Sequence, residues 1–286
     1  MRNDRGPRAT HGLAGLFGPR SITWKINRES VLLLGGGRAL LLQIAHPLVA
    51  AGVAVHSDFR TDPLGRLQRT LDAVQTITFG TTAEARRAYQ RVDTVHGGVK
   101  GRIAEPDAGL DAGTRYAARD PELLFWVHAT LVDTALTVYD RYVTRLTPTE
   151  RRRYYEESRR TARIFRIPES LIPENLAAFE RYMERMLADG GPIRVGDTAR
   201  DIAAAILHPP ISYVPSRVFD PLNLVTVGLL PDRLRREFGL EWTPARRLLF
   251  DASGVAVRNL LPLLPNLVRS MPPARAAERR VANLEK

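Results

Sequence analysis

Helix-start signals recur along nearly the whole 286-residue chain, and they limit its fold more than any other feature. Asp62-Pro63 and Asp120-Pro121 each place a capping acid before a proline, which suits the first position of a helix. Thr147-Pro-Thr-Glu150 is a capping box, and Ile172-Pro-Glu-Asn175 opens another helix. Because strand-like alternation of apolar and polar residues is essentially absent, the sequence predicts an all-α fold.

Apolar residues at helical spacing predict which helix faces are buried. The predicted faces are Leu64, Leu67, Leu71 and Val74; Tyr89, Val92, His96, Val99 and Ile103; Leu124, His128, Leu131 and Ala135; and Leu176, Phe179, Met183 and Leu187. A proline-rich run over 209–221 predicts an irregular connector, with helices again from about Leu222 and over 244–264. We expect a flexible tail over 1–20, one helical domain over 21–270, and a basic helix or tail over 271–286.

The composition limits the chemistry available to the chain. The sequence contains no cysteine, which excludes disulfides, thiolate catalysis, iron–sulfur clusters and cysteine zinc sites. The formal net charge is +11, but the arginines recur beside acids, as at 151–153 before Glu156 and at 233–236 before Glu237. That pattern is typical of solvated helix faces, and no nucleic-acid-binding motif accompanies it. Nucleic acid is therefore not an expected partner.

The location of the protein is predicted from its N-terminus and its most apolar stretch. No apolar segment follows the charged first residues, so we expect no secretory signal and a cytoplasmic location. The stretch Val31–Val55 is interrupted by Arg38, Gln43 and His46-Pro47, which predicts two buried helices rather than a membrane span. Peripheral contact with a membrane stays an open alternative.

Gly35-Gly36-Gly37 has neither the lysine of a phosphate-binding loop nor a parallel-sheet pattern around it. These glycines are instead expected to let a flat group or another helix pack against the backbone.

Four histidines, His46, His56, His96 and His128, lie in apolar helical contexts. A buried imidazole without a partner costs about 1 to 3 kcal/mol, so His96 should either hydrogen-bond within the core or bind a metal. Periodicity alone favours the core hydrogen bond. The sequence has no HExxH, paired ExxH or HxH pattern, so a site with one histidine ligand fits better than a multi-histidine centre. Haem needs only one such histidine, because the porphyrin supplies the four equatorial ligands.

A second group of polar residues is expected to need oxygen or anionic partners. Arg66, Arg69 and Thr70 share one side of a helix at spacings i, i+3 and i+4. Haem propionates or a bound oxygen species would satisfy them, and so would salt bridges within the protein, to Asp58, Asp62 or Asp72.

Over roughly residues 25–240 the chain resembles the oxygenase family that contains latex clearing protein (rubber oxygenase) and the fungal MpaB enzymes. The separate motifs are short, but their order and spacing are specific. They are Gly35-Gly-Gly-Arg-Ala-Leu-Leu-Leu-Gln-Ile-Ala-His-Pro47, His56-Ser-Asp-Phe59, Asp62-Pro-Leu-Gly-Arg-Leu-Gln-Arg-Thr70, Phe79-Gly80, Val92-Asp-Thr-Val-His96 and Tyr116-Ala-Ala-Arg-Asp-Pro-Glu-Leu-Leu-Phe-Trp-Val-His128.

The resemblance implies an all-helical fold around a b-type haem that activates dioxygen, with cleavage of isoprenoid double bonds in the best-known members. His96 matches the axial ligand. Arg66 and Thr70 match an Arg-x-x-Lys-Thr motif, in which Arg69 replaces the family's distal lysine. Since arginine cannot be deprotonated, reversible lysine-like occupancy of the sixth iron position is doubtful here. His128 matches a family histidine that would orient His96 or line the pocket.

From these residues we expect a haem-dependent oxygenase that acts with dioxygen on a lipophilic small molecule. Arg69 and Thr70 would line the distal side, and Arg66 and Arg38 would pair with the propionates. A backbone carbonyl or His128 would hold the second nitrogen of His96. His46 or His56 would be the acid or base, although helix packing explains both equally well. The alternatives are a haem sensor or carrier, peroxidase-like chemistry, or a cofactor-free helical binding protein; the oligomeric state is not predicted.

Overall fold

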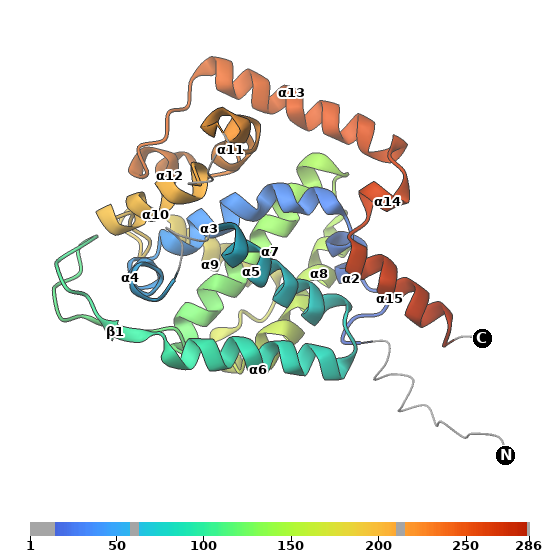
Figure 1. Ribbon diagram of the computed structural model, residues 1–286, viewed down its shortest axis with the longest axis horizontal. Coiled ribbons are helices and arrows are strands. Elements are labelled where there is room, and N and C mark those ends of the chain that lie inside the picture. The colour runs from blue at the N-terminus through green and yellow to red at the C-terminus, as the bar shows by residue number, and fades with distance from the viewer. Residues whose placement is uncertain (1–14, 58–62, 210–214, 285–286) are drawn as a thin grey trace.

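A computed structural model describes residues 15–57, 63–209 and 215–284 (Figure 1). The side chains of Pro63, Leu64, Arg66, Leu67 and Ser216 lie outside this description. Within it, the chain is built from helices, and the one sheet is an antiparallel pair of short strands, β1 (Lys100–Arg102) and β2 (Arg115–Ala117). The all-α prediction is confirmed.

The long helix α7 (Pro121–Tyr142) forms the axis of the core. Asp120 caps it by accepting a hydrogen bond from the Glu122 backbone N–H, as its sequence predicts. Trp126 is completely buried, and its indole N–H donates to the carbonyl of Leu42 at 3.2 Å. The short helix η1 (Ser30–Gly35) and α3 (Gly36–Ile44) pack along α7, so the N-terminal helices are held by the middle of the chain.

The glycine triplet is explained by these helix contacts. A Cβ atom on Gly35 would lie 2.6 Å from Cγ2 of Thr134 in α7. A Cβ atom on Gly37 would lie 2.3 Å from Oγ1 of Thr226 in α11 (Asp220–Gly228). Real Cβ atoms do not approach other atoms this closely. The glycines therefore allow helices to pack against the α3 backbone, which was one of the two expected explanations.

The apolar stretch near the N-terminus forms α3 and α4 (Pro47–His56), as predicted. Within the described ranges no single helix is long and apolar enough to cross a membrane. The segments Ser30–Ile44 and Pro47–His56 meet the length and composition test only together, and they are bent by 105°. Leu41, Leu42 and Ile44 lie in the protein core.

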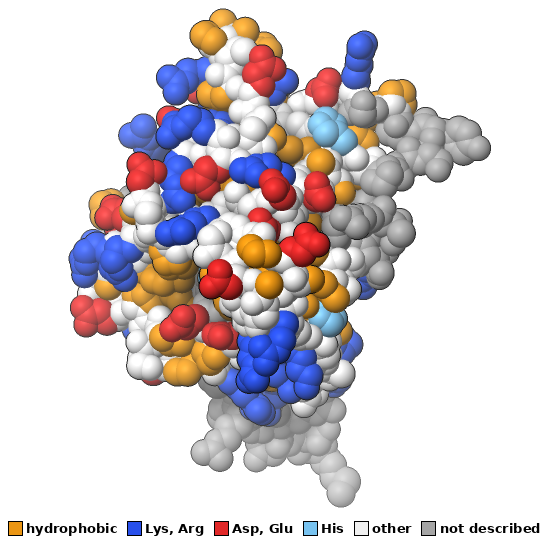
Figure 2. Space-filling model, turned by 90° about the vertical axis from the view of Figure 1, so that its left-hand side faces the viewer, with side chains coloured by type: hydrophobic (Ala, Val, Ile, Leu, Met, Phe, Trp, Pro, Cys, Tyr) orange, Lys and Arg blue, Asp and Glu red, His pale blue; other side chains and the backbone are white. Residues whose placement is uncertain are grey.

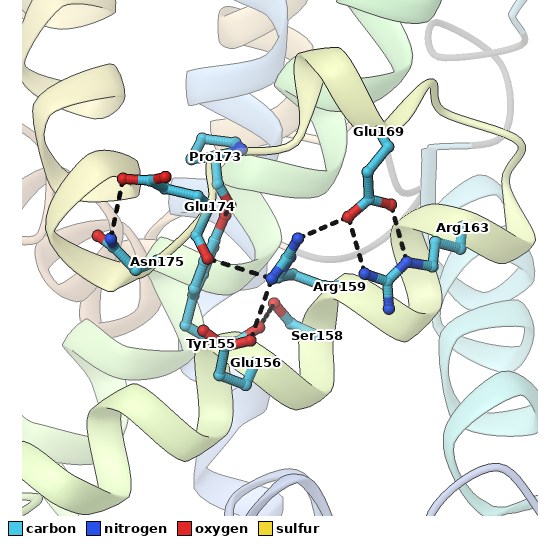
Figure 3. Close-up of polar contacts among 9 residues, drawn as sticks. All are labelled: Tyr155, Glu156, Ser158, Arg159, Arg163, Glu169, Pro173, Glu174 and Asn175. Atoms are coloured by element: carbon cyan, nitrogen blue, oxygen red, sulfur yellow. Dashed lines mark hydrogen bonds and ion pairs between the residues drawn. The ribbon is translucent and has the colours of Figure 1, made fainter.

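An ion-pair network holds the connection between α8 (Pro148–Ile164), η2 (Glu169–Leu171) and α9 (Leu176–Leu187) (Figure 3). Arg159 and Arg163 project from α8 and both bind the carboxylate of Glu169, at 2.5 and 2.8 Å. The Tyr155 hydroxyl donates to the carbonyl of Pro173 at 2.6 Å. Of these two arginines, Arg163 is 49% exposed and fits the predicted solvated helix face, whereas Arg159 is only 17% exposed.

The remaining helices complete the domain. They are α2 (Ile22–Asn27), α10 (Asp197–Leu207), η3 (Ser216–Phe219), α12 (Asp232–Glu237), α13 (Pro244–Leu260), η4 (Leu261–Leu263), α14 (Asn266–Arg269) and α15 (Pro272–Ala282). Helix α15 packs on α5 (Pro63–Phe79), and its Ala274 and Ala277 are completely buried. Phe17 is also buried, so the packed part of the chain begins before the predicted residue 21.

Two details of the predicted helix faces are wrong. Val74 is exposed, because α5 turns the side of Gln75 and Thr78 toward the protein. The helix α6 (Thr82–Gly98) does not continue to Ile103. After Gly97 and Gly98 the backbone becomes extended, and the following residues pair with β2.

Candidate functional site

Helices α5 and α6 form a hairpin that carries half of the predicted site residues: Arg66, Arg69, Thr70 and His96. Each helix has 17 residues, they pack against each other, and they run in opposite directions (Figure 1). Only Gly80 and Thr81 separate them. The beginning of α5, with Arg66, Arg69 and Thr70, therefore lies at the same end of the hairpin as His96. The structure brings the predicted ligand and the predicted distal residues to one end.

His96 lies in the last turn of α6 and is half-buried. Burial lowers the pKa of its imidazole; Asp93 opposes this effect and Arg119 adds to it. In the part of the chain that the structure describes, neither ring nitrogen has a hydrogen-bond partner. The imidazole is therefore neutral near pH 7, and one of its nitrogens presents an unused lone pair.

His128 lies on α7, and burial lowers its pKa to about 4. Its ring lies 6.2 Å from the ring of Phe125. The predicted hydrogen bond from His128 or a backbone carbonyl to His96 is absent among the described residues. His128 is thus a second neutral imidazole with no hydrogen bond inside this region.

The side chains of Arg69 and Thr70 are exposed, and each makes contacts within the protein. The Arg66 side chain, like Asp58 and Asp62, lies outside the described residues. Asp72, one of the salt-bridge partners considered above, accepts a hydrogen bond from Gln68 at 2.7 Å. The assignment of these residues to a distal pocket stays a prediction.

Arg38 is buried in a contact between three helices. Its Nε donates to the carbonyl of Leu229 at 2.8 Å, Nη1 donates to Oγ1 of Thr134 at 2.7 Å, and Nη2 lies 2.6 Å from Oδ2 of Asp133. All three guanidinium nitrogens therefore have protein partners. These bonds give Arg38 a structural role between α3 and α7, and none of them leads to the α5–α6 hairpin where a propionate is expected.

His46 and His56 occupy opposite ends of α4, about 15 Å apart along a ten-residue helix. His46 caps the start, because its Nδ1 accepts the backbone N–H of Leu48 at 3.3 Å. His56 is exposed at the end, where Nε2 lies 3.3 Å from the hydroxyl oxygen of Tyr116. These contacts provide the helix-packing explanation for both residues, and their acid–base roles stay predictions.

His46 also lines a cavity of about 250 Å³. Burial lowers the pKa of His46 to about 4, so its ring is neutral and its Nε2 carries the proton. Glu122 and Tyr182 supply the other polar groups, and burial, with a smaller effect from Glu122, raises the pKa of Tyr182 above its usual range. The remaining walls are apolar: Phe125, Leu171, Met186 and Pro192. The cavity suits a small apolar molecule with one polar group.

Neither Glu122 nor Tyr182 was predicted as a site residue. Glu122 has the position of an ordinary first-turn acid, and Tyr182 lies on a distant helix. Both residues come near His46 only through the packing of α7 and α9, and no local sequence pattern shows that packing.

The described residues hold no group of three or more histidine, aspartate or glutamate side chains that could bind a metal ion. A second cavity, of about 600 Å³, lies near α2 and contains none of the predicted site residues. Any metal bound at His96 would therefore need further ligands from outside the described residues.

A family model described as "ER-bound oxygenase mpaB/B'/Rubber oxygenase, catalytic domain" matches residues 24–259. The chain belongs to this family. The resemblance found in the sequence is confirmed, and the domain is an oxygenase-type catalytic domain. Two relatives, Uncharacterized protein Rv2237 of Mycobacterium tuberculosis and Uncharacterized protein Mb2261 of Mycobacterium bovis, are each 26% identical over 222 residues, which is 74% of this chain and 82% of theirs. No solved structure matches the chain.

Proposed function

We propose that this protein is an oxygenase that binds haem b through His96 and oxidises a lipophilic small molecule. One observation supports this most directly: His96 is kept neutral by burial and has no hydrogen-bond partner among the described residues. A neutral imidazole with a free lone pair, beside the motif residues of α5, could donate that pair to a haem iron.

The donor set fits haem better than a bare metal ion. The described side chains offer no cluster of three ligands, whereas the porphyrin would supply four nitrogens of its own, so His96 would be enough to hold the iron on the protein. Bound haem would supply the iron that activates dioxygen for oxidation of a substrate such as an isoprenoid-like alkene. Family membership supports the oxygenase class, and the haem and the substrate are our proposals.

The residues of α5 would bind and orient groups around the haem. Arg69 would keep a fixed positive charge with several N–H donors, because its guanidinium does not lose its proton. Thr70 would offer a hydroxyl that can donate or accept. Arg66 would pair with a propionate through a charge-assisted hydrogen bond.

The cavity beside His46 is our candidate for the apolar part of the substrate. Phe125 forms one of its walls and also lies next to the His128 ring. With Nδ1 already accepting from Leu48, His46 would present Nε2–H as a hydrogen-bond donor to an oxygen of the substrate or product.

The proposal is tested by measuring the Soret absorbance of the purified full-length protein after reconstitution with haem. Wild type should bind one haem, and His96→Ala should lose it. His56→Ala is the matched control, because it removes an exposed histidine from another helix and should keep the haem. A His96→Ala protein that retains a full complement of haem would disprove the ligand assignment.

Oxygen consumption then separates the remaining functions. Loaded enzyme with an alkene and a reductant should consume dioxygen. Haem binding with no turnover would indicate a sensor or carrier, turnover with peroxide alone would indicate a peroxidase, and no haem binding at all would indicate a cofactor-free binding protein.

A further inference from the structure

Helix α13 carries an apolar face that points away from the protein. Its large side chains are highly exposed: Leu248 is 71% exposed, Val255 64% and Leu260 59%, and Leu263 in η4 is 77% exposed. At 100° per residue Leu248, Val255 and Leu260 fall on one side of α13, which they share with the exposed Asn259, and Leu263 follows in η4. We call this face the outer stripe, and it consists of Leu248, Leu249, Ala252, Val255, Ala256, Leu260 and Leu263.

The outer stripe is not needed to hold α13 on the protein. The opposite side of the helix does this, since Phe250 and Leu261 belong to a core cluster with Tyr142 of α7 and Val225 of α11. Arg141 strengthens the contact by lying 3.5 Å from the centroid of the Phe250 ring. An amphipathic surface helix normally has one apolar side, so a second apolar side indicates a second contact.

The apolar surface continues beyond the helix. In α14, Leu267 is 71% exposed and Val268 is 57% exposed. Figure 1 shows α13 as a long helix along the outside of the molecule, followed by α14. In Figure 2, hydrophobic side chains lie at the top of the molecule, with lysine and arginine side chains just below them. Scattered exposed aliphatic residues are ordinary on a soluble protein, but a continuous row marks an interaction surface.

Positive charge borders the outer stripe. Arg246 and Arg247 lie in the first turn of α13 and Arg258 lies near its end. The one acidic residue of the helix, Asp251, pairs with Arg141 at 3.0 Å. An apolar helix face with arginines at its edges has the composition of helices that lie in the interface of an anionic bilayer. A two-fold pairing of two such faces would instead bring like charges together.

We propose that the outer stripe and α14 dock this protein onto an anionic lipid bilayer. The aliphatic side chains would enter the boundary between head groups and acyl chains, and Arg246 and Arg247 would bind lipid phosphates. This surface goes beyond the oxygenase chemistry and does not depend on haem. If the substrate is lipophilic, as proposed above, docking would also place the enzyme where such a molecule accumulates.

The test is co-sedimentation of the full-length protein with vesicles of phosphatidylcholine, with and without phosphatidylglycerol. Wild type should bind the anionic vesicles, and added salt should weaken the binding. Leu248→Ser combined with Leu260→Ser should reduce the affinity about tenfold or more, because each change removes an aliphatic side chain that would be buried in the bilayer on docking. Arg246→Gln combined with Arg247→Gln should weaken binding to the anionic vesicles alone.

Val55→Ser is the matched control, because Val55 is 68% exposed on α4, outside the stripe. It should bind vesicles as wild type does, and thermal unfolding should show that every variant is folded. Absence of wild-type binding to anionic vesicles at low salt would overturn the proposal. So would a dimer in light scattering that Leu260→Ser converts to a monomer, because the stripe would then join two copies of the chain. Haem content and oxygen consumption are measured separately, so failure here leaves the proposed function standing.

Discussion

Arg119 and Asp93 form a two-pronged ion pair across the end of α6. Nε of Arg119 lies 3.1 Å from Oδ1 of Asp93 and Nη2 lies 2.8 Å from Oδ2, while Nη2 also donates to the Asp93 carbonyl at 2.9 Å. Asp93 lies about one turn before His96, and Arg119 immediately precedes the α7 cap. A Cβ atom on Gly97 would come within 3.0 Å of the guanidinium. The pair therefore ties the turn that carries His96 to the start of α7.

Arg119→Gln should increase the rate of haem loss while changing stability little. The two side chains are 53% and 35% exposed, and such a pair contributes about 1 kcal/mol or less. Its role would be to orient the His96 turn. Transfer of haem to an apo-globin acceptor measures the rate, and thermal unfolding measures stability. Arg163→Gln is the control, because it breaks an exposed ion pair on α8. Equal rates of haem loss in both variants would contradict this role.

Arg69→Lys should give the bound haem a pH-dependent spectrum that wild type lacks. Lysine loses its proton near pH 10.4 in water and at lower pH when desolvated, whereas arginine stays charged. If residue 69 lies near the proposed haem, a neutral amine could bind the iron, whereas a guanidinium could not. Spectra recorded from about pH 7 to 10 test this. Arg86→Lys, on an exposed position of α6, should behave as wild type. An unchanged spectrum for Arg69→Lys would place residue 69 away from the iron.

Arg38→Met should destabilise the protein whether or not haem is bound. Removing the guanidinium leaves the Leu229 carbonyl and the Asp133 carboxylate without their partner. Breaking a fully buried pair costs about 3 to 5 kcal/mol, and the cost here should be smaller because the Asp133 side chain is partly exposed. Urea unfolding with and without haem measures this. Asp133→Asn is the milder control, since the Asp133 side chain is 27% exposed. Normal stability with weakened haem binding would instead support the propionate role predicted from the sequence.

Gly37→Ala should also destabilise the fold, by about 1 to 3 kcal/mol. The new methyl group would meet Thr226, which is completely buried and branched at Cβ, so it has little freedom to move. Gly18→Ala is the control, because nothing lies within 4 Å of a Cβ atom there. Thermal unfolding compares the two. Equal melting temperatures would show that α3 and α11 can move apart without any loss of stability.

The helices could be predicted because their signals are local. Asp120, Thr147 and Asn175 each cap the helix that the sequence assigns to them, since a cap depends on residues within one turn. The end of α6 could not be predicted in the same way. Val99 and Ile103 continue the helical spacing, but pairing of 100–102 with 115–117 depends on residues far along the chain.

The same distinction between local signals and contacts from distant segments applies to the residues of the candidate site. His96 and Arg69, which the family resemblance associates in one site, lie on consecutive helices of one hairpin. Leu229, which accepts a hydrogen bond from Arg38, and Tyr182, which lines a cavity with His46, come from distant segments, and only the packed structure brings them together.

Acid should destabilise the protein between about pH 6.5 and pH 4, a range in which most carboxylates are still ionised. Burial holds the pKa of both His128 and His46 at about 4, whereas a histidine in the unfolded chain has a pKa near 6.5. Between these values the unfolded state binds more protons, so stability falls as the pH falls and is unaffected above about pH 6.5. Each histidine contributes at most about 3 kcal/mol.

Urea unfolding of wild type and His128→Phe at pH 7 and pH 5 measures the difference. His128→Phe should lose less stability on acidification, and His56→Gln should lose as much as wild type. An equal loss in His128→Phe and wild type would show that another group senses the acid.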